Sequence, residues 1–110
     1  MQEIRLEFGT FEDKQWTFNL VNFDLSGTTL RSEIRSETGV LVGSFVPTIT
    51  GSNQFTLAIN ASVSGGIAPG EYKSDVLARN NTTFLQTFIT PIFTVNVVDR
   101  ITQPAAVVIP

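Results

Sequence analysis

Short segments in which apolar and polar residues alternate run along almost the whole chain, and this pattern constrains the fold more than any other feature. In the clearest segment, 30–35, Leu30 and Ile34 share one face while Arg31 and Arg35 share the other. A period of two residues is typical of a strand with one buried and one solvated face. The same pattern predicts further strands over 3–8, 14–21, 40–46, 54–60, 71–78, 83–89 and 93–97. About eight short strands at this spacing are typical of an all-β sandwich or barrel, and we expect a sandwich.

Proline and glycine indicate where strands end. Proline has no backbone N–H to donate to a sheet, so Pro47 is expected to end the strand over 40–46. Residues 61–70 are rich in glycine and close in Pro69-Gly70, a strong turn dipeptide. We expect this stretch to be a long loop or a short helical turn.

The apolar face of each predicted strand supplies the candidate core. Nine Phe against one Trp and one Tyr favour a core of apolar rings that need no hydrogen-bond partner. The chain has 110 residues, of which 42% are hydrophobic, which suits a single domain with one core. The predicted core residues are Trp16, Phe18, Leu20, Leu30, Ile34, Phe55, Leu57, Ile59, Tyr72 and Val76.

The chain contains no His and no Cys. It therefore lacks the usual general base near neutral pH, the usual nucleophilic thiol and the best transition-metal ligands. Asp24 is separated from Ser26 by a leucine, unlike the loop of an aspartic protease, and no second loop supplies a paired carboxylate. Glu12 and Asp13 are interpreted as a solvated turn rather than a calcium site. We expect no enzyme activity, no cofactor and no metal.

Asp75 is an acidic residue predicted to lie in the middle of the strand over 71–78, on its outer face. Arg31 and Arg35 are predicted to face outward on another strand. We expect one of these arginines to form a cross-strand ion pair with Asp75, worth about 0.2–1 kcal/mol.

Charge and hydropathy exclude two classes of partner. The net charge is −3, and the five Arg and two Lys are scattered rather than clustered, so we expect no nucleic-acid binding. No apolar run approaches the roughly 20 residues of a membrane-spanning helix, so we expect no membrane partner. The first residues have no cationic stretch followed by an apolar one, so no secretion signal is expected.

The C-terminal residues differ in composition from the rest. We divide the chain into a β-sandwich domain over 1–102 and an apolar arm over 103–110, which carries no charge and contains two prolines. Such apolar surface is unusual in a free monomer, so we expect the arm to pack on an adjacent subunit of a homo-oligomer. The alternative is a frayed terminus without a role. The candidate interface residues are Val107, Val108 and Ile109 in the arm, and Ile67 in the glycine-rich loop.

Several stretches resemble one family of domains. They are Trp16-Thr17-Phe18, Asp24-Leu25-Ser26-Gly27 leading into 30–35, Gly51-Ser52-Asn53 leading into Phe55-Thr56-Leu57, Ile67-Ala68-Pro69-Gly70-Glu71-Tyr72, and the closing Val95-Asn96-Val97-Val98-Asp99-Arg100-Ile101-Thr102. They extend over roughly residues 14–102 and resemble the immunoglobulin-like N-terminal domains of bacteriophage baseplate upper proteins and related tail, neck or fibre-anchoring proteins. The resemblance implies a two-sheet antiparallel immunoglobulin-like sandwich of about seven to eight strands.

The resemblance also implies a function. The implied function is that of a non-catalytic structural protein of the virion. Such a protein is assembled in the host cytoplasm and docks to other virion subunits in the tail, baseplate or neck/fibre attachment. Two other functions stay open: a capsid decoration or cement protein, and a carbohydrate or host-receptor binding module. Exposed Trp16 or Tyr72 rings would favour glycan stacking, whereas buried rings favour assembly, and strand parity predicts that both point inward.

Overall fold

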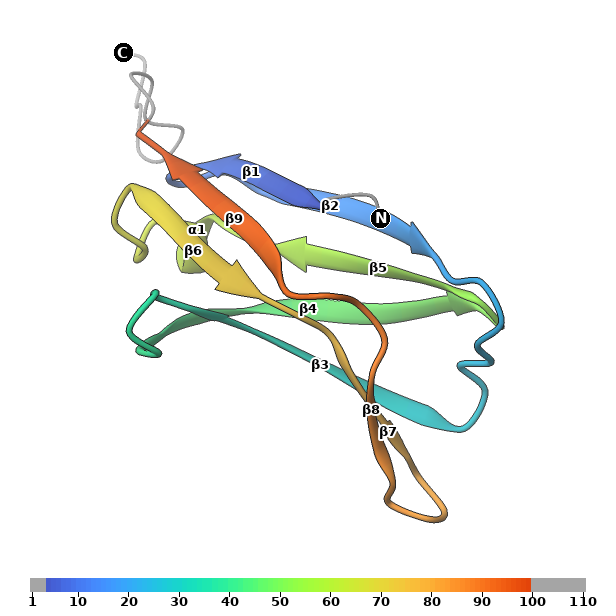
Figure 1. Cartoon of the computed structure of the whole chain (residues 1–110). Coiled ribbons are helices and arrows are strands. Elements are labelled where there is room, and N and C mark those ends of the chain that lie inside the picture. Colours follow the sequence, from blue (N-terminus) through green and yellow to red (C-terminus); the bar gives the residue numbers. More distant parts are fainter. Residues whose placement is uncertain (1–3, 100–110) are drawn as a thin grey trace.

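The computed structural model describes residues 4–99 and has nine strands and one short helix within them (Figure 1). The elements are β1 (Arg5–Gly9), β2 (Lys14–Asn19), β3 (Thr28–Arg35), β4 (Leu41–Gly51), β5 (Gln54–Ile59), α1 (Ala61–Ser64), β6 (Gly70–Ser74), β7 (Leu77–Asn80), β8 (Gln86–Phe88) and β9 (Phe93–Val98). The all-β prediction is confirmed. There is one strand more than the sequence predicts, because the segment 71–78 contributes to two strands, β6 and β7.

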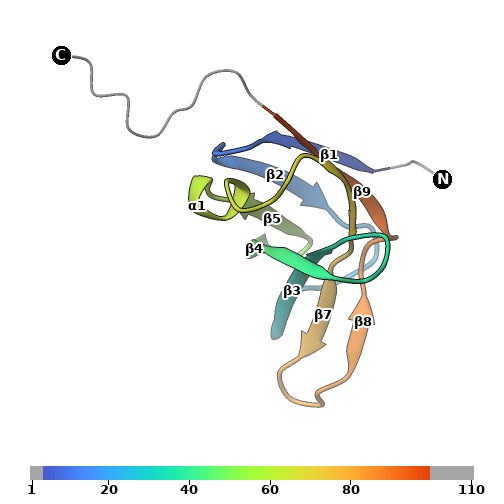
Figure 2. The same cartoon turned by 90° about the vertical axis from the view of Figure 1, so that its left-hand side faces the viewer.

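Seven of the strands form one curved sheet in the order β1-β9-β6-β3-β4-β5-β2. β1 joins β9 in parallel, and every other pairing in this order is antiparallel. The two ends of the order, β1 and β2, follow each other in the chain and lie close together. The ring centroids of Phe8 and Trp16 are 6.1 Å apart, and Lys14 Nζ donates a hydrogen bond to the Glu7 carbonyl (2.9 Å). The sheet is therefore nearly closed and barrel-like (Figure 2).

β4 links two parts of this sheet. It pairs with β3 as far as Phe45 and with β5 from Val46 onward. The prediction that Pro47 ends the strand is wrong, since Pro47 lies inside β4 opposite Leu57. Within the described residues, β4 has only β5 as a neighbour here. A residue without an N–H is tolerated at such a position because its nitrogen can face the open side.

The core fills the space inside the curved sheet. Of the predicted core residues, five are buried and five are half-buried and packed against the buried cluster, so the core prediction is confirmed. Phe55 is fully buried and its ring stacks on that of Phe18, with centroids 5.0 Å apart. Leu25, from the loop before β3, and Ile67, from the loop after α1, also belong to the buried cluster. Loops as well as strands therefore close the core.

The strand predicted over 71–78 breaks at Asp75 and Val76. β6 pairs with β9 and the end of β3, whereas β7 pairs with the beginning of β3. At the break, the buried Ser32 hydroxyl donates to the Asp75 carbonyl (2.8 Å), and the Val76 N–H donates to Thr90 Oγ1 (3.0 Å). These side chains satisfy backbone groups that the sheet leaves unpaired. Beyond the break, the β7–β8 hairpin projects from the body (Figures 1 and 2).

Candidate interaction surface

Acidic side chains near the turns bind backbone groups. Glu12 Oε1 accepts a hydrogen bond from the Gly9 N–H (2.6 Å), and Asp13 Oδ1 accepts one from the Ala61 N–H (2.6 Å). Asp24 accepts from the backbone N–H two residues later (2.9 Å), which holds the pKa of its carboxyl below the usual value. Among residues 4–99, no three His, Cys, Asp or Glu side chains gather as a metal site would need. The acidic residues considered for chemistry are turn residues in this structure.

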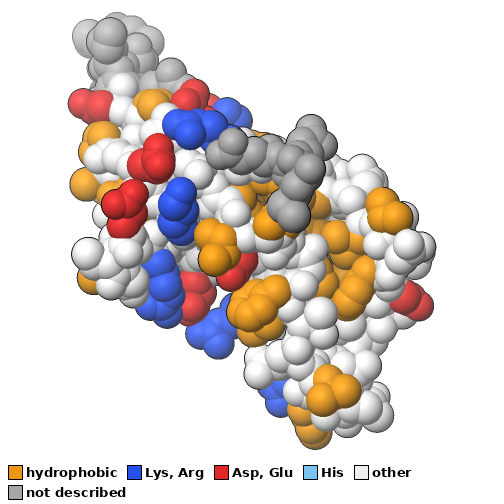
Figure 3. Space-filling view, in the orientation of Figure 1, with side chains coloured by type: hydrophobic (Ala, Val, Ile, Leu, Met, Phe, Trp, Pro, Cys, Tyr) orange, Lys and Arg blue, Asp and Glu red, His pale blue; other side chains and the backbone are white. Residues whose placement is uncertain are grey.

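The surface carries four large apolar side chains at the β7–β8 hairpin, which we call the hairpin patch. Phe84, Leu85, Phe88 and Ile92 keep 61%, 71%, 63% and 71% of their surface exposed. All four come from β8 and the segments on either side of it, and hydrophobic side chains gather over the hairpin and its base in Figure 3. Exposed apolar patches mark interaction sites on soluble proteins.

The tip of the hairpin holds Phe84 in a defined position. Its φ of 62° is a left-handed conformation that bulky residues rarely adopt. Asn80 organises the tip: its Oδ1 accepts from the N–H groups of Thr82 (2.8 Å) and Thr83 (2.9 Å), and its carbonyl accepts from that of Phe84 (2.9 Å). The Arg79 guanidinium lies 4.8 Å from the centre of the Phe84 ring, within the range of a cation–π contact. The fold thus presents this ring in a backbone conformation that glycine would adopt without strain.

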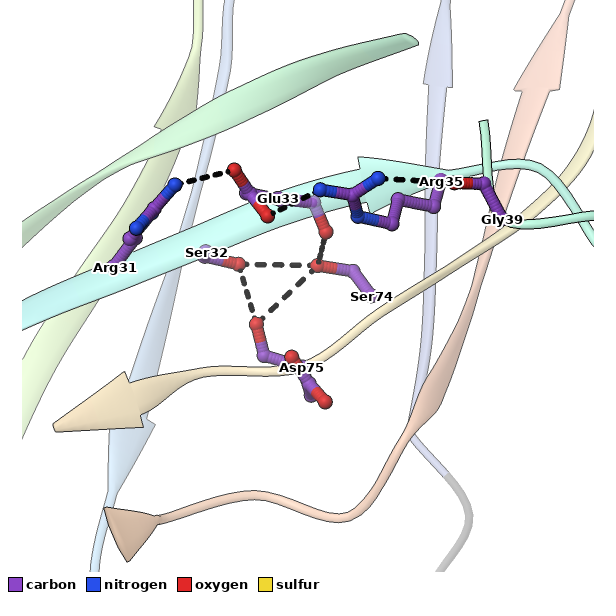
Figure 4. Close-up of polar contacts among 7 residues, drawn as sticks. All are labelled: Arg31, Ser32, Glu33, Arg35, Gly39, Ser74 and Asp75. Carbon is purple, nitrogen blue, oxygen red and sulfur yellow. Dashed lines mark hydrogen bonds and ion pairs between the residues drawn. The ribbon is translucent and has the colours of Figure 1, made fainter. Parts of the chain in front are cut away.

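Beside the hairpin, the outer face of β3 carries a charged row. Arg31 Nη2 lies 2.8 Å from Glu33 Oε2, and Arg35 Nη2 lies 2.9 Å from Glu33 Oε1 (Figure 4). These hydrogen bonds, with that of Arg35 the stronger cause, hold the pKa of Glu33 below its usual value. Arg35 also donates to the Gly39 carbonyl (2.9 Å). Arg31 and Arg35 are exposed and Glu33 is half-buried, on the outer face that the alternation of this strand predicts.

The ion pair expected between Asp75 and Arg31 or Arg35 does not form. Both arginines bind Glu33, and the strand break displaces Asp75 from the cross-strand position assumed for it. Its side chain points away from the arginines in Figure 4. Partial burial raises the pKa of Asp75, and the negative charge of Glu33 raises it further.

A hollow of about 370 Å³ lies where the charged row meets the base of the hairpin. Its acidic lining groups are Glu33 and Asp75. The lining also includes Arg31, Arg35, Lys73, Leu77, Phe88 and Ile92. Because Phe88 and Ile92 belong to the hairpin patch, a partner that covers the patch would also meet charged side chains.

Of the four predicted interface residues, the structure describes only Ile67. Val107, Val108 and Ile109 fall outside the described residues. Ile67 belongs to the core, with 2% of its surface exposed. Its side chain packs inward in this structure, and its part in an interface stays a prediction.

The two rings considered for glycan stacking are engaged in packing. The Trp16 ring centroid lies 6.1 Å from that of Phe8 and 5.6 Å from that of Phe45. The Tyr72 hydroxyl donates a hydrogen bond to the Ala68 carbonyl (2.6 Å). Both rings are half-buried and packed against the core, as strand parity predicts.

Sequence reasoning missed the hairpin patch, although the sequence contains a signal for it. The strand predicted over 83–89 is apolar on both faces, with Phe84 and Phe88 on one and Leu85 and Ile89 on the other. In the structure both faces of β8 are solvated, since Gln86, Thr87 and Phe88 are all exposed. Only Ile89 packs against the core, while Phe84, Leu85 and Phe88 face solvent.

Comparison with known proteins gives this chain no family. No family model matches the sequence, and no curated protein matches it. Among residues 4–99, no helix has the length and apolarity to cross a membrane. The structure itself defines the class: a small all-β domain that presents an apolar hairpin beside a charged strand.

Proposed function

We propose that the chain is a non-catalytic structural protein of a bacteriophage virion that docks to other virion subunits in the tail, baseplate or neck/fibre attachment. The observation that carries the docking role is the hairpin patch: three large apolar side chains on the projecting hairpin, with Ile92 at its base, are exposed to water. This exposure is unfavourable, and a partner that covers the patch would remove it. The virion setting rests on the resemblance of residues 14–102 to immunoglobulin-like domains of phage tail proteins.

The proposal includes an immunoglobulin-like arrangement of the strands. Three features of the barrel-like sheet support it. The first strand, β1, pairs in parallel with the last, β9, and β2 pairs in antiparallel fashion with β5 at the other end of the order. β4 then passes from β3 to β5 and would serve as the element that links two sheets.

Packing favours assembly over glycan binding. A sugar-stacking site needs an open aromatic face with polar groups around it, and both Trp16 and Tyr72 are packed against the core. The exposed rings of the hairpin patch are phenylalanines, which have no polar atom to bond a sugar hydroxyl. A capsid decoration protein would use the same patch at a different place in the virion.

The test is the copy number of the chain in purified virions of the bacteriophage that carries its gene, measured by quantitative mass spectrometry. We expect a fixed number of copies per particle. When the Phe84→Ser, Phe88→Ser double variant replaces the wild-type chain during phage growth, the virions should contain few copies of the chain. Val40→Ser is the matched control, since Val40 is similarly exposed (60%) at the opposite end of β3.

Two results would overturn the proposal. Virions that lack the chain would exclude a structural role. Wild-type binding to a glycan array that is lost in Phe88→Ser, with unchanged copy number, would replace docking by receptor binding.

A further inference from the structure

The open edge of β8 is a place where another strand can add. Among residues 4–99, β8 pairs only with β7. The Leu85 carbonyl and the Ile89 N–H bond toward β7, to Asn80 (2.8 Å) and Val76 (2.9 Å). Because backbone groups alternate in direction along an antiparallel strand, the N–H and C=O groups of the intervening Gln86 and Phe88 face the open edge. They are free to receive an incoming strand.

This edge is short and is followed by Pro91, but no charged side chain guards it against pairing. Exposed edge strands are commonly guarded by charged side chains, especially lysine, or by inward-pointing charge. The segment 84–92 contains no Lys, Arg, Asp or Glu, and its exposed side chains include the four of the hairpin patch. A strand that pairs here with favourable packing is therefore uncharged and apolar.

The chain carries one segment of that chemistry outside the described residues. Residues 105–109, Ala-Ala-Val-Val-Ile, are uncharged and lie between Pro104 and Pro110. Each of the five has a backbone N–H, and Val and Ile favour strands. The flanking prolines limit the strand to this length, which suits a short acceptor such as β8.

A segment of the same copy is poorly placed to reach this edge. β9 leads away from the hairpin (Figure 1), and its six residues cover about 20 Å. The five residues between Asp99 and Ala105 can span at most about 20 Å when fully extended. Fully extended, these five residues can do no more than run back along the length of β9, so they do not carry residues 105–109 of the same copy to β8. A second copy supplies the segment more readily.

We propose that residues 105–109 of one copy add as a strand to β8 of the next copy, with their apolar side chains covering the hairpin patch. The inference rests on the proposed function, because it names the partner of the same hairpin. Donor segment and acceptor edge lie on different parts of the chain. The contact is therefore head to tail, and it propagates into a ring or a filament.

Two complementary variants separate the donor from the acceptor. Deleting residues 103–110 leaves an acceptor without a donor. Gln86→Pro removes an N–H that faces the open edge, where proline is tolerated, and leaves a donor without an acceptor. Phe88→Lys is a second acceptor variant that places a charge at the edge without restricting the backbone. Gln86→Thr, which keeps the N–H, is the control.

The readout is mass in solution by analytical ultracentrifugation, with thermal melts to confirm that each variant is folded. We expect wild type and Gln86→Thr to associate, and the deletion, Gln86→Pro and Phe88→Lys each to be monomeric. An equimolar mixture of the deletion variant and wild type should give shorter assemblies, because each deletion copy ends a chain. A peptide of residues 103–110 should bind the deletion variant. Its affinity for the Gln86→Pro form of that variant should be lower by about tenfold or more.

Monomeric wild type at its highest soluble concentration, or association that survives either the deletion or both acceptor variants, would overturn the inference. The virion copy number is measured separately. A chain present in virions but monomeric in solution, with no peptide binding, would exclude the head-to-tail contact and leave the proposed function standing.

Discussion

The packing of Phe55 gives the sharpest prediction about stability. Its side chain is fully buried, stacks on Phe18 at a centroid distance of 5.0 Å, and lies opposite Phe18 in the β2–β5 register. Phe55→Ala removes a buried ring and leaves a cavity, which costs about 3–5 kcal/mol. For a domain of this length, about 1 kcal/mol corresponds to about 5 °C in Tm, so we expect a drop of about 15–25 °C.

The control for Phe55→Ala is Phe88→Ala, the same substitution at a residue that is 63% exposed. Because little is buried there, the expected change is below about 0.5 kcal/mol, or about 3 °C. Both variants are melted in a calorimeter under one buffer condition, at a concentration at which the wild type is monomeric, so that lost association does not contribute to the shift. Equal shifts in the two variants, or a shift below about 5 °C for Phe55→Ala, would refute the assignment of Phe55 to the core and of Phe88 to the surface.

Three further predictions concern polar groups. The pKa of the Glu33 carboxyl, measured by NMR titration, should lie below its usual value of 4.5 and should rise in Arg35→Gln. The stabilising effect of the carboxylate is therefore present above pH 4.5 and is lost as the pH falls through the lowered pKa. A pKa that is unchanged in the variant would contradict the ion pair. The pKa of Asp75 is raised, so the folded state favours the protonated carboxyl and loses stability as the pH rises through 3.8 and beyond. Asp75→Asn should therefore raise Tm at pH 7 and leave it unchanged at pH 3. A lower Tm at pH 7 would mean that the Asp75 carboxylate stabilises the fold, and would contradict the raised pKa. Thr90→Val should cost about 1–3 kcal/mol in urea unfolding, because the buried Val76 N–H loses its acceptor; a midpoint equal to wild type would mean that this bond is dispensable.

Alternation along a strand predicts the fold where one face is buried and the other solvated. Segment 30–35 satisfies this condition, and its inward and outward residues lie as the pattern indicates. The pattern fails at Asp75 and Val76, where alternation continues although the strand breaks. The break depends on Ser32 and Thr90, whose hydroxyls bond the freed backbone groups from distant parts of the sequence. No local pattern contains such long-range contacts.

The residue pattern of a single strand also does not show which other strands it pairs with. The sequence predicts that Pro47 ends a strand because a central strand needs every N–H, but the second half of β4 has one neighbour among the described residues. The hairpin patch was missed for a related reason. The residue pattern of segment 83–89 does not show that the strand lies at an edge, whereas in the structure β8 pairs only with β7 among residues 4–99 and Phe84 and Phe88 are exposed.

The central claim is that the hairpin is a docking surface in a virion. The most direct test is a cryo-electron microscopy reconstruction of the purified virion, resolved well enough to place the β-strands of this domain. We expect density for the domain with Phe84, Leu85 and Phe88 buried against another subunit. Density in which these three side chains face solvent, or no density for the domain at all, would contradict the claim.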